Sequence, residues 1–228
     1  MQSQIISTKL QQIAEQAVKE PEKVFTDLMH LVDVEFLKEA YRKTRKDAAP
    51  GLDGVTAQQY GENLDVNLRN LYERMRMGKY RAPAVKRIWL EKENGKMRPI
   101  GIPEFEDKVV QRAVSMLLTA VYEQDFSDAS YGFRPGRNAH QALQNLWEEC
   151  NRINIGWILD VDVSGFFDNL GHQQLQEILK QRVNDGGIRR YIGKWLNAGI
   201  VDGGSLSYSE RGTPQGGVIT LPTIVQKG

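Results

Sequence analysis

The stretch "WILDVDVSGFFDN", residues 157–169, places two carboxylates two positions apart inside an apolar run. Successive side chains of a β-strand point to opposite faces, so Asp160 and Asp162 would share one face and the apolar side chains the other. We therefore predict a buried strand over residues 156–163. Burying an unpaired carboxylate is costly, and a bound metal ion is one way to offset that cost. An exposed strand end or a salt bridge to an arginine is the alternative interpretation.

Local patterns on both sides of this stretch predict a mixed α/β (α+β) fold, with helices preceding an incomplete antiparallel sheet. Two hairpins are expected, one within 84–103 around Asn94-Gly95 and one around Gly203-Gly204, with Pro99 suited to an edge strand. Thr56 and Asn138 are expected N-caps. Apolar spacing and capping residues predict helices at 4–19, 22–46, 56–77, 104–122, 138–150, 172–181 and 187–198.

Composition bounds the class of protein. The 228 residues are 26% charged and 40% hydrophobic, an ordinary balance for a globular protein. No run approaches the roughly 20 apolar residues of a membrane span, and the N-terminus lacks a cationic segment followed by an apolar one. The single cysteine, Cys150, cannot form an internal disulfide and fits a reducing compartment. We therefore expect a cytoplasmic protein.

Charge is concentrated locally although the formal net charge of the chain is only +1. Residues 74–98 hold nine basic side chains against two acidic ones, a local charge of +7, with Tyr80 and Trp89 between them. Such a stripe suits a phosphate backbone, although a solvated face is the plainer interpretation. The basic residues are Arg74, Arg76, Lys79, Arg81, Lys86, Arg87, Lys92, Lys96 and Arg98.

Five blocks occur in a recognisable order from about residue 37 to 219, and together they resemble the bacterial group II intron reverse transcriptases. The blocks are "KDAAPGLDGVT" (46–56), "EKENGKMRPIGIPEFEDKVVQRAV" (91–114), "YGFRPGRNAHQAL" (131–143), "LDVDVSGFFDN" (159–169) and "RGTPQGGVI" (211–219). The resemblance implies the fingers and part of the palm of a right-hand polymerase. It divides the chain into a helical N-terminal extension with the start of the fingers (1–80), fingers (81–155) and partial palm (156–228).

The resemblance also implies the residues of a site. In the family's palm motif, the metal-binding aspartate is followed five positions later by an aromatic residue that screens the sugar, a spacing that Asp162 and Phe167 match. Asp162 and the backbone carbonyl of Val163 would then bind Mg²⁺. Asp160 would be a neighbour that tunes the site, and Asp168 a local cap.

Nucleotide and template contacts are implied in the same way. Lys92 and Arg98 would hold the triphosphate, with a solvated hairpin as the alternative, and Gln215 would contact the nucleotide. The basic stripe and the Gly/Pro loop of 131–140 suggest template contacts through phosphates and stacking; Tyr131 and Phe133 are equally suited to the core. The predicted template-binding residues are Arg74, Arg76, Arg81, Arg134 and Arg137.

The match departs from the family after residue 219, where the chain reads "TLPTIVQKG" and no Tyr-Ala-Asp-Asp block follows. One aspartate and one carbonyl supply too few oxygens for the ions of in-line phosphoryl transfer. We therefore expect a truncated RNA-directed DNA polymerase, inactive alone, whose full-length form uses template RNA, a DNA primer and deoxynucleoside triphosphates and acts in intron splicing and mobility. The alternative is a non-catalytic RNA-binding module or a decayed remnant.

Overall fold

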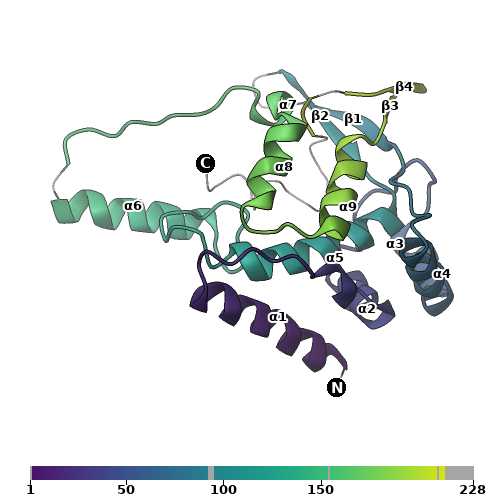
Figure 1. Ribbon diagram of the computed structural model, residues 1–228. Coiled ribbons are helices and arrows are strands. Elements are labelled where there is room, and N and C mark those ends of the chain that lie inside the picture. Colours follow the sequence, from purple (N-terminus) through teal and green to yellow (C-terminus); the bar gives the residue numbers. More distant parts are fainter. Residues whose placement is uncertain (1, 92–94, 154, 210, 214–228) are drawn as a thin grey trace.

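The fold is built around one helix that is buried on almost every side. In the computed structural model, which describes residues 2–91, 95–153, 155–209 and 211–213, α5 (Phe105–Tyr122) occupies the centre of the helical body. Its valines, its leucines and Ala113 are fully or almost fully buried. α1 (Gln2–Lys19) and α2 (Val34–Lys43) pack against it, as Figure 1 shows. The predicted core-facing helix at 104–122 is confirmed.

The second predicted helix, 22–46, is wrong in its first half. Residues 25–33 contain only a short 3₁₀ helix, η1 (Met29–Leu31), and α2 starts where the Asp33 carboxylate accepts a hydrogen bond from the amide of Phe36 at 2.8 Å. Phe25 instead pairs with the segment around Val183, donating to the Arg182 carbonyl at 2.9 Å. A long-range backbone partner replaces the helical one there.

Thr56 caps a helix as predicted, in a reciprocal capping box with Gln59. The single helix expected as far as Met77 is divided at Asn63 into α3 (Ala57–Glu62) and α4 (Leu64–Arg76). Asn63 has φ −122° and ψ 40°, outside the helical region, which breaks the run of backbone hydrogen bonds.

A four-stranded sheet lies beside the helical body. The strands are β1 (Val85–Glu91), β2 (Met97–Ile102), β3 (Ile200–Asp202) and β4 (Ser205–Ser207), in the order β2-β1-β3-β4. β1 pairs antiparallel with β2 and parallel with β3, and β3 pairs antiparallel with β4. Both predicted hairpins are therefore present, and Pro99 lies on an edge strand, although Asn94 is outside the described residues.

Three helices complete the body: α7 (Phe166–Asn169), α8 (His172–Lys180) and α9 (Gly186–Leu196). The last two match the predicted helices at 172–181 and 187–198. α8 and α9 stand side by side on the α5 layer, and α9 leads into the sheet (Figure 1). Because β1 and β3 share one sheet, the predicted fingers and palm segments are joined by backbone pairing; the boundaries between them stay a prediction.

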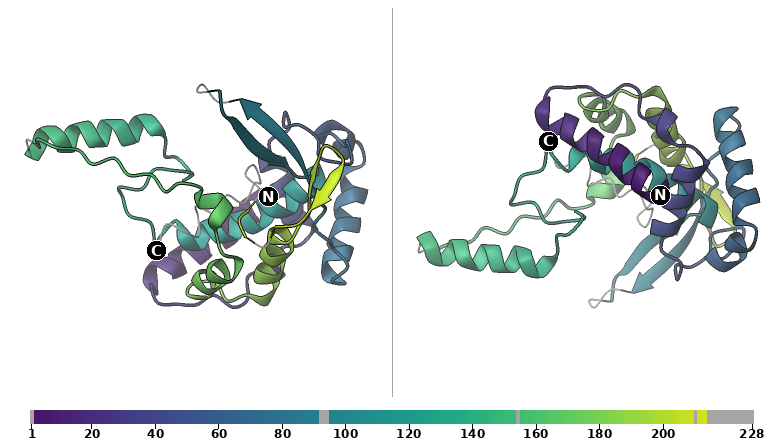
Figure 2. Two further views of the ribbon diagram at one scale, coloured as in Figure 1. Left: turned by 90° about the horizontal axis from the view of Figure 1, so that it is seen from above. Right: turned by 90° about the horizontal axis from the view of Figure 1, so that it is seen from below.

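The predicted buried strand at 156–163 is wrong. This segment has no regular structure, and the side chains of Trp157 and Leu159 are 94% and 87% exposed. A strand needs a neighbour for its backbone groups, and no described residue pairs with this segment. It connects α7 to α6 (Ala139–Ile153), which projects from the body in every view of Figures 1 and 2.

The helix of 138–150 begins as predicted. The Asn138 side chain accepts from the amide of Gln141 at 3.0 Å, and the Gln141 side chain accepts from the amide of Asn138 at 2.8 Å. α6 nevertheless has no buried residue, and its apolar face remains exposed. Among the described helices, none combines the length and the apolar character needed to cross a membrane.

A buried arginine in the loop after α8 connects α1 to the loop after α5. The side chain of Arg182 is 1% exposed and pairs with Asp125 at 2.9 Å. Its remaining N–H groups donate to backbone carbonyls at the end of α1 and in the turn after it, those of Ala17, Glu20 and Lys23, at 2.7–3.0 Å. One side chain thereby fixes α1 against the loop after α5 and the loop after α8.

We expect Arg182→Met to lower the free energy of unfolding by about 3–5 kcal/mol, because the Asp125 carboxylate would stay buried without its partner. Lys180→Met is the control: it removes an exposed pair with Glu177 and should cost no more than about 1 kcal/mol. Urea unfolding of both variants measures the difference. Equal losses would contradict the structural role of Arg182.

Candidate functional site

Two of the sequence blocks lie side by side although about 40 residues separate them. The amide of Thr213 donates to the carbonyl of Phe167 at 2.9 Å, and the amide of Gly212 donates to the carbonyl of Leu170 at 2.8 Å. The His172 Nε2 lies 2.7 Å from the Gly212 carbonyl. The segment that begins "RGT" is therefore attached along α7 and the start of α8. We call this contact the 167–213 junction.

Gly212 is required by the close approach of the two backbones at this junction. Its φ is +79°, a region that side chains rarely adopt. A Cβ atom there would lie 2.7 Å from the Asp168 carbonyl oxygen and 2.8 Å from that of Phe167, inside van der Waals contact. Backbone atoms cannot give way as a flexible side chain can, so only glycine fits.

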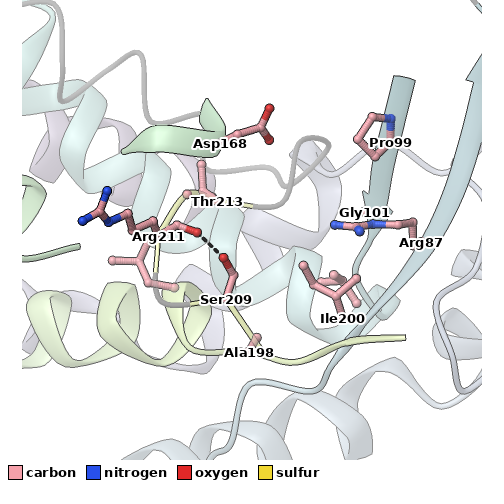
Figure 3. A pocket seen from close by; sticks show the side chains of 12 residues that line it. Arg87, Pro99, Gly101, Asp168, Ala198, Ile200, Ser209, Arg211 and Thr213 are labelled. Atoms are coloured by element: carbon pink, nitrogen blue, oxygen red, sulfur yellow. Dashed lines mark hydrogen bonds between the residues drawn. The ribbon is translucent and has the colours of Figure 1, made fainter. Parts of the chain in front are cut away.

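A pocket of about 120 Å³ separates the 167–213 junction from the β1–β2 hairpin. Arg87, Pro99 and Gly101 line it from the hairpin; Asp168, Gly212 and Thr213 line it from the junction (Figure 3). Gly101 is directly opposite Arg87 in the strand register, so no side chain fills the space beside the guanidinium. We call this space the hairpin pocket.

Arg87 is one of two arginines that line the hairpin pocket, and the sequence analysis counted it only as part of the basic stripe. Its guanidinium lies 5.7 Å from the centre of the Trp89 ring, and the Trp89 indole donates to the Asp202 carboxylate at 3.2 Å. In Figure 3 the Arg87 side chain points toward the pocket, whereas that of Arg211 points away from the hairpin. The alternation of Val85 and Arg87 on one face of β1 is the signal that would have found it.

Arg98, a predicted triphosphate ligand, is not among the residues lining the hairpin pocket. It follows Met97 at the start of β2 opposite Leu90, and its neighbour Pro99 takes the pocket face, so Arg98 belongs to the other face of the hairpin. Lys92 and Gln215, the other predicted nucleotide contacts, lie outside the described residues.

Asp162 and Val163, the predicted metal ligands, lie in the exposed segment before α7 rather than at the hairpin pocket. Within 2–91, 95–153, 155–209 and 211–213, no three His, Cys, Asp or Glu side chains are close enough to hold a metal ion. Phe167 is half-buried and packs edge-on against Phe166, with ring centres 5.4 Å apart. The structure thus brings Phe167, but not Asp162, to the junction.

Arg134 is committed to the fold. Its side chain is 6% exposed and pairs with Glu123 at 2.9 Å. Its other N–H groups donate to the carbonyls of Ser127 and Ser130 at 2.7 and 2.8 Å, which closes the loop after α5. A contact between Arg134 and a template would require breaking these bonds.

The neighbouring side chains of this loop are more accessible. Arg137 pairs with Asp128 at 3.1 Å and lies 5.1 Å from the centre of the Tyr131 ring. Phe133 is 70% exposed and has φ +59°, a strained value for a side chain of its size. Of the two aromatic residues, Phe133 is therefore not part of the core, and Tyr131 is half-buried beside Arg137.

The three arginines predicted from the basic stripe differ in their surroundings. Arg74 pairs with Glu106 at 2.5 Å, and the Tyr60 hydroxyl donates to the same carboxylate at 3.2 Å. Burial and the Glu106 charge raise the pKa of the Tyr60 phenol, so that it remains a donor. Arg76 and Arg81 are exposed. Arg74 thus links α4 to α5 through this ion pair, whereas the other two face solvent.

We expect Gly212→Ala to open the 167–213 junction, so that the amide hydrogens of Gly212 and Thr213 exchange at least about tenfold faster. Gly54→Ala is the matched control, because Gly54 has φ +69° but a Cβ atom added there would meet no other atom within 4 Å. The Gly54→Ala variant therefore has the same backbone strain but no steric clash of the new Cβ atom. Hydrogen exchange followed by NMR measures both variants, and unchanged exchange at Thr213 would contradict the steric argument.

The comparisons with known proteins agree on the family. Residues 90–227 match the family "Reverse transcriptase (RNA-dependent DNA polymerase)". The chain is 34% identical to Protein YkfC of Escherichia coli over 223 residues and 31% identical to the group II intron-encoded protein LtrA of Lactococcus lactis over 216 residues. These alignments cover 95% and 92% of this chain but only 58% and 35% of the two relatives.

A solved structure described as a partial Cas6-RT-Cas1–Cas2 complex is similar in fold. It has a TM-score of 0.50 and 18% sequence identity, and the match covers 83% of this chain and 31% of the other. At that identity, the likeness concerns the fold alone. The family match covers more than half of the chain and includes β2, the 167–213 junction and the carboxylate segment, whereas most of β1 precedes it. The chain therefore belongs to the reverse transcriptase (RNA-dependent DNA polymerase) family, and its resemblance to the group II intron members is confirmed.

Proposed function

We propose that this protein acts in RNA-directed DNA synthesis of the group II intron type, with template RNA, a DNA primer and deoxynucleoside triphosphates as its substrates. The observation that carries the proposal is the hairpin pocket, where a basic hairpin faces the 167–213 junction in a chain of the reverse transcriptase family. Intron RNA as the natural template, and a role in splicing and mobility in a longer form, are supported by the likeness to the protein LtrA. A cytoplasmic location is proposed on the lone Cys150.

Arg87 is the proposed nucleotide contact that lines the hairpin pocket. Arg87 presents a planar fork of donors, which suits a phosphate group. We assign Lys92 and Arg98 to the triphosphate as the family resemblance implies, and Gln215, two positions after Thr213 in the sequence, to the nucleotide. Phe167 would screen the sugar, and the bond from Thr213 holds its backbone in place.

Divalent metal ions are generally used by reverse transcriptases, and we propose Mg²⁺ with Asp162 and the Val163 carbonyl as its ligands here. Bound Mg²⁺ would neutralise charge on the phosphates of the nucleotide. Octahedral Mg²⁺ requires six oxygens, and in the described part of the chain no three His, Cys, Asp or Glu side chains gather to hold a metal ion. The Asp162 carboxylate and the Val163 carbonyl are oxygen ligands of the type that Mg²⁺ prefers, but they supply only some of the oxygens that it needs. We therefore propose that the 228-residue chain does not extend a primer by itself.

A second candidate function is RNA binding without catalysis. The exposed position of Asp162, away from the hairpin pocket, favours it. Both candidate functions use the basic stripe of residues 74–98 to bind RNA. They differ in whether the chain also binds nucleoside triphosphates with Mg²⁺.

Arg87→Gln is expected to weaken binding of a fluorescent deoxynucleoside triphosphate by roughly tenfold or more, the loss of one charge-assisted contact. Arg211→Gln is the matched control: it removes the same charge from the same pocket, but that guanidinium points away from the hairpin (Figure 3). We expect its effect to be clearly smaller. No binding by the unaltered chain would favour the RNA-binding module.

Primer extension tests the second part of the proposal. With template RNA, primer, nucleotides and Mg²⁺, the purified 228-residue chain should give no product above a reaction without protein. Asp162→Ala is measured beside it. Product from the unaltered chain that disappears in this variant would show that the site is complete and would overturn the proposed inactivity.

A further inference from the structure

A second pocket lies at the other end of α9 from the hairpin pocket. The hairpin pocket touches Leu196 and Ala198, at the end of α9, whereas the second pocket touches Gly187, Arg190 and Tyr191, near its beginning. An eleven-residue helix is about 16 Å long, so the two places are well separated. The second pocket has a volume of about 200 Å³. We call it the α9 pocket.

Two arginines from different helices line the α9 pocket. Arg76 comes from the last turn of α4 and Arg190 from α9, and both are exposed. Neither forms an ion pair or a side-chain hydrogen bond with another described residue. Their charges are thus available to a ligand that reaches both.

Positive charge continues from the pocket along the adjoining surface. Burial and the charges of Arg190 and Arg81 lower the pKa of Lys194, so these three cations lie near one another. The Lys194 ammonium donates to the Tyr80 carbonyl, which holds it beside the α4–β1 connection. We define the α9 basic surface as Arg76, Arg81, Arg190 and Lys194.

Two carboxylates beside the pocket, those of Asp185 and Asp27, already have partners. The buried Asp185 carboxylate accepts from the amides of Leu28 at 2.6 Å, Met29 at 2.9 Å and Ile188 at 2.8 Å. Asp27 contacts His30 Nδ1 at 2.8 Å, and His30 itself lines the pocket. Neither carboxylate pairs with an arginine of the α9 basic surface.

The rest of the pocket wall is largely apolar, with Met29, Val32, Tyr72, Met75 and Tyr191. Charge–charge attraction is stronger beside such a wall than in open water. Guanidinium groups bind phosphate oxygens in a planar, two-point geometry. Because the cations extend beyond the pocket along α9 and the α4–β1 connection, the surface matches a chain of phosphates better than a single small anion.

We propose that the α9 pocket and the α9 basic surface bind the phosphodiester backbone of structured RNA, at a place separate from the hairpin pocket. This inference rests on the proposed function, since it assumes that the protein works on RNA. In the sequence, Arg76 and Arg81 precede the β1–β2 hairpin. We assign them instead to a surface that they share with Arg190 and Lys194. RNA held there would contact the protein away from the nucleotide.

The test measures binding of a fluorescent RNA hairpin to the full 228-residue chain over a range of salt concentrations. In the double variant Arg76→Gln/Arg190→Gln, the slope of log K against log salt should become shallower by about 1 for each arginine. The control is Lys19→Gln/Arg42→Gln, which removes two exposed cations from α1 and α2. It should keep the slope of the unaltered chain.

Further measurements separate this inference from the proposed function. Arg76→Lys/Arg190→Lys should retain the slope, because charge rather than fork geometry sets counterion release. Nucleotide binding at the hairpin pocket should be unchanged in both variants. An RNA slope that is unaltered in the glutamine variant, or altered equally in the control, overturns the α9 site alone. An unaltered chain without salt-dependent RNA binding overturns both proposals.

Discussion

The guanidinium of Arg182 is the constraint on which the helical body depends. An arginine side chain has five N–H donors, and a buried one is tolerated only when they are satisfied. Here all five find acceptors, two on the Asp125 carboxylate and three on carbonyls at the end of α1 and in the turn after it. The same residue offers its own carbonyl to Phe25. The path between α8 and α9, and with it the position of α9, follows from this arrangement.

A second buried polar group connects α9 to the sheet. The Asp107 carboxylate, on α5, accepts from Trp195 and Gln111 at 2.8 Å each, and from the Tyr80 hydroxyl. Burial raises the pKa of Asp107 against the opposing effect of these three donors. Tyr80 precedes β1 and Trp195 precedes β3, so the network holds the two strands where they pair. The hairpin pocket and the α9 pocket lie at opposite ends of α9, so both depend on how this helix is packed.

The carboxylate segment contrasts with this order. Trp157, Leu159 and Val161 are exposed, and so are Leu143 and Trp147 on α6. Apolar surface on this scale is unfavourable in water, and a contiguous patch usually marks a contact surface. Asp160 and Asp162 are exposed in the same segment. The parts of the site that depend on the helical body and the hairpin are formed, and the carboxylate part is not.

The sequence alone determined what depends on neighbours within a few residues: most of the helices, the caps at Thr56 and Asn138, both hairpins and the family. It also located Phe167 and the block beginning at Arg211, because short motifs carry that information. Contacts between distant residues were decided by tertiary structure, since local spacing does not encode them. The Phe25 segment pairs with Val183 instead of forming the predicted helix, and Arg134 forms a buried ion pair with Glu123. The register that sets Gly101 opposite Arg87 leaves the space of the hairpin pocket. The apolar alternation of 156–163 is a strand pattern by local rules, yet a strand forms only where another backbone supplies its hydrogen bonds.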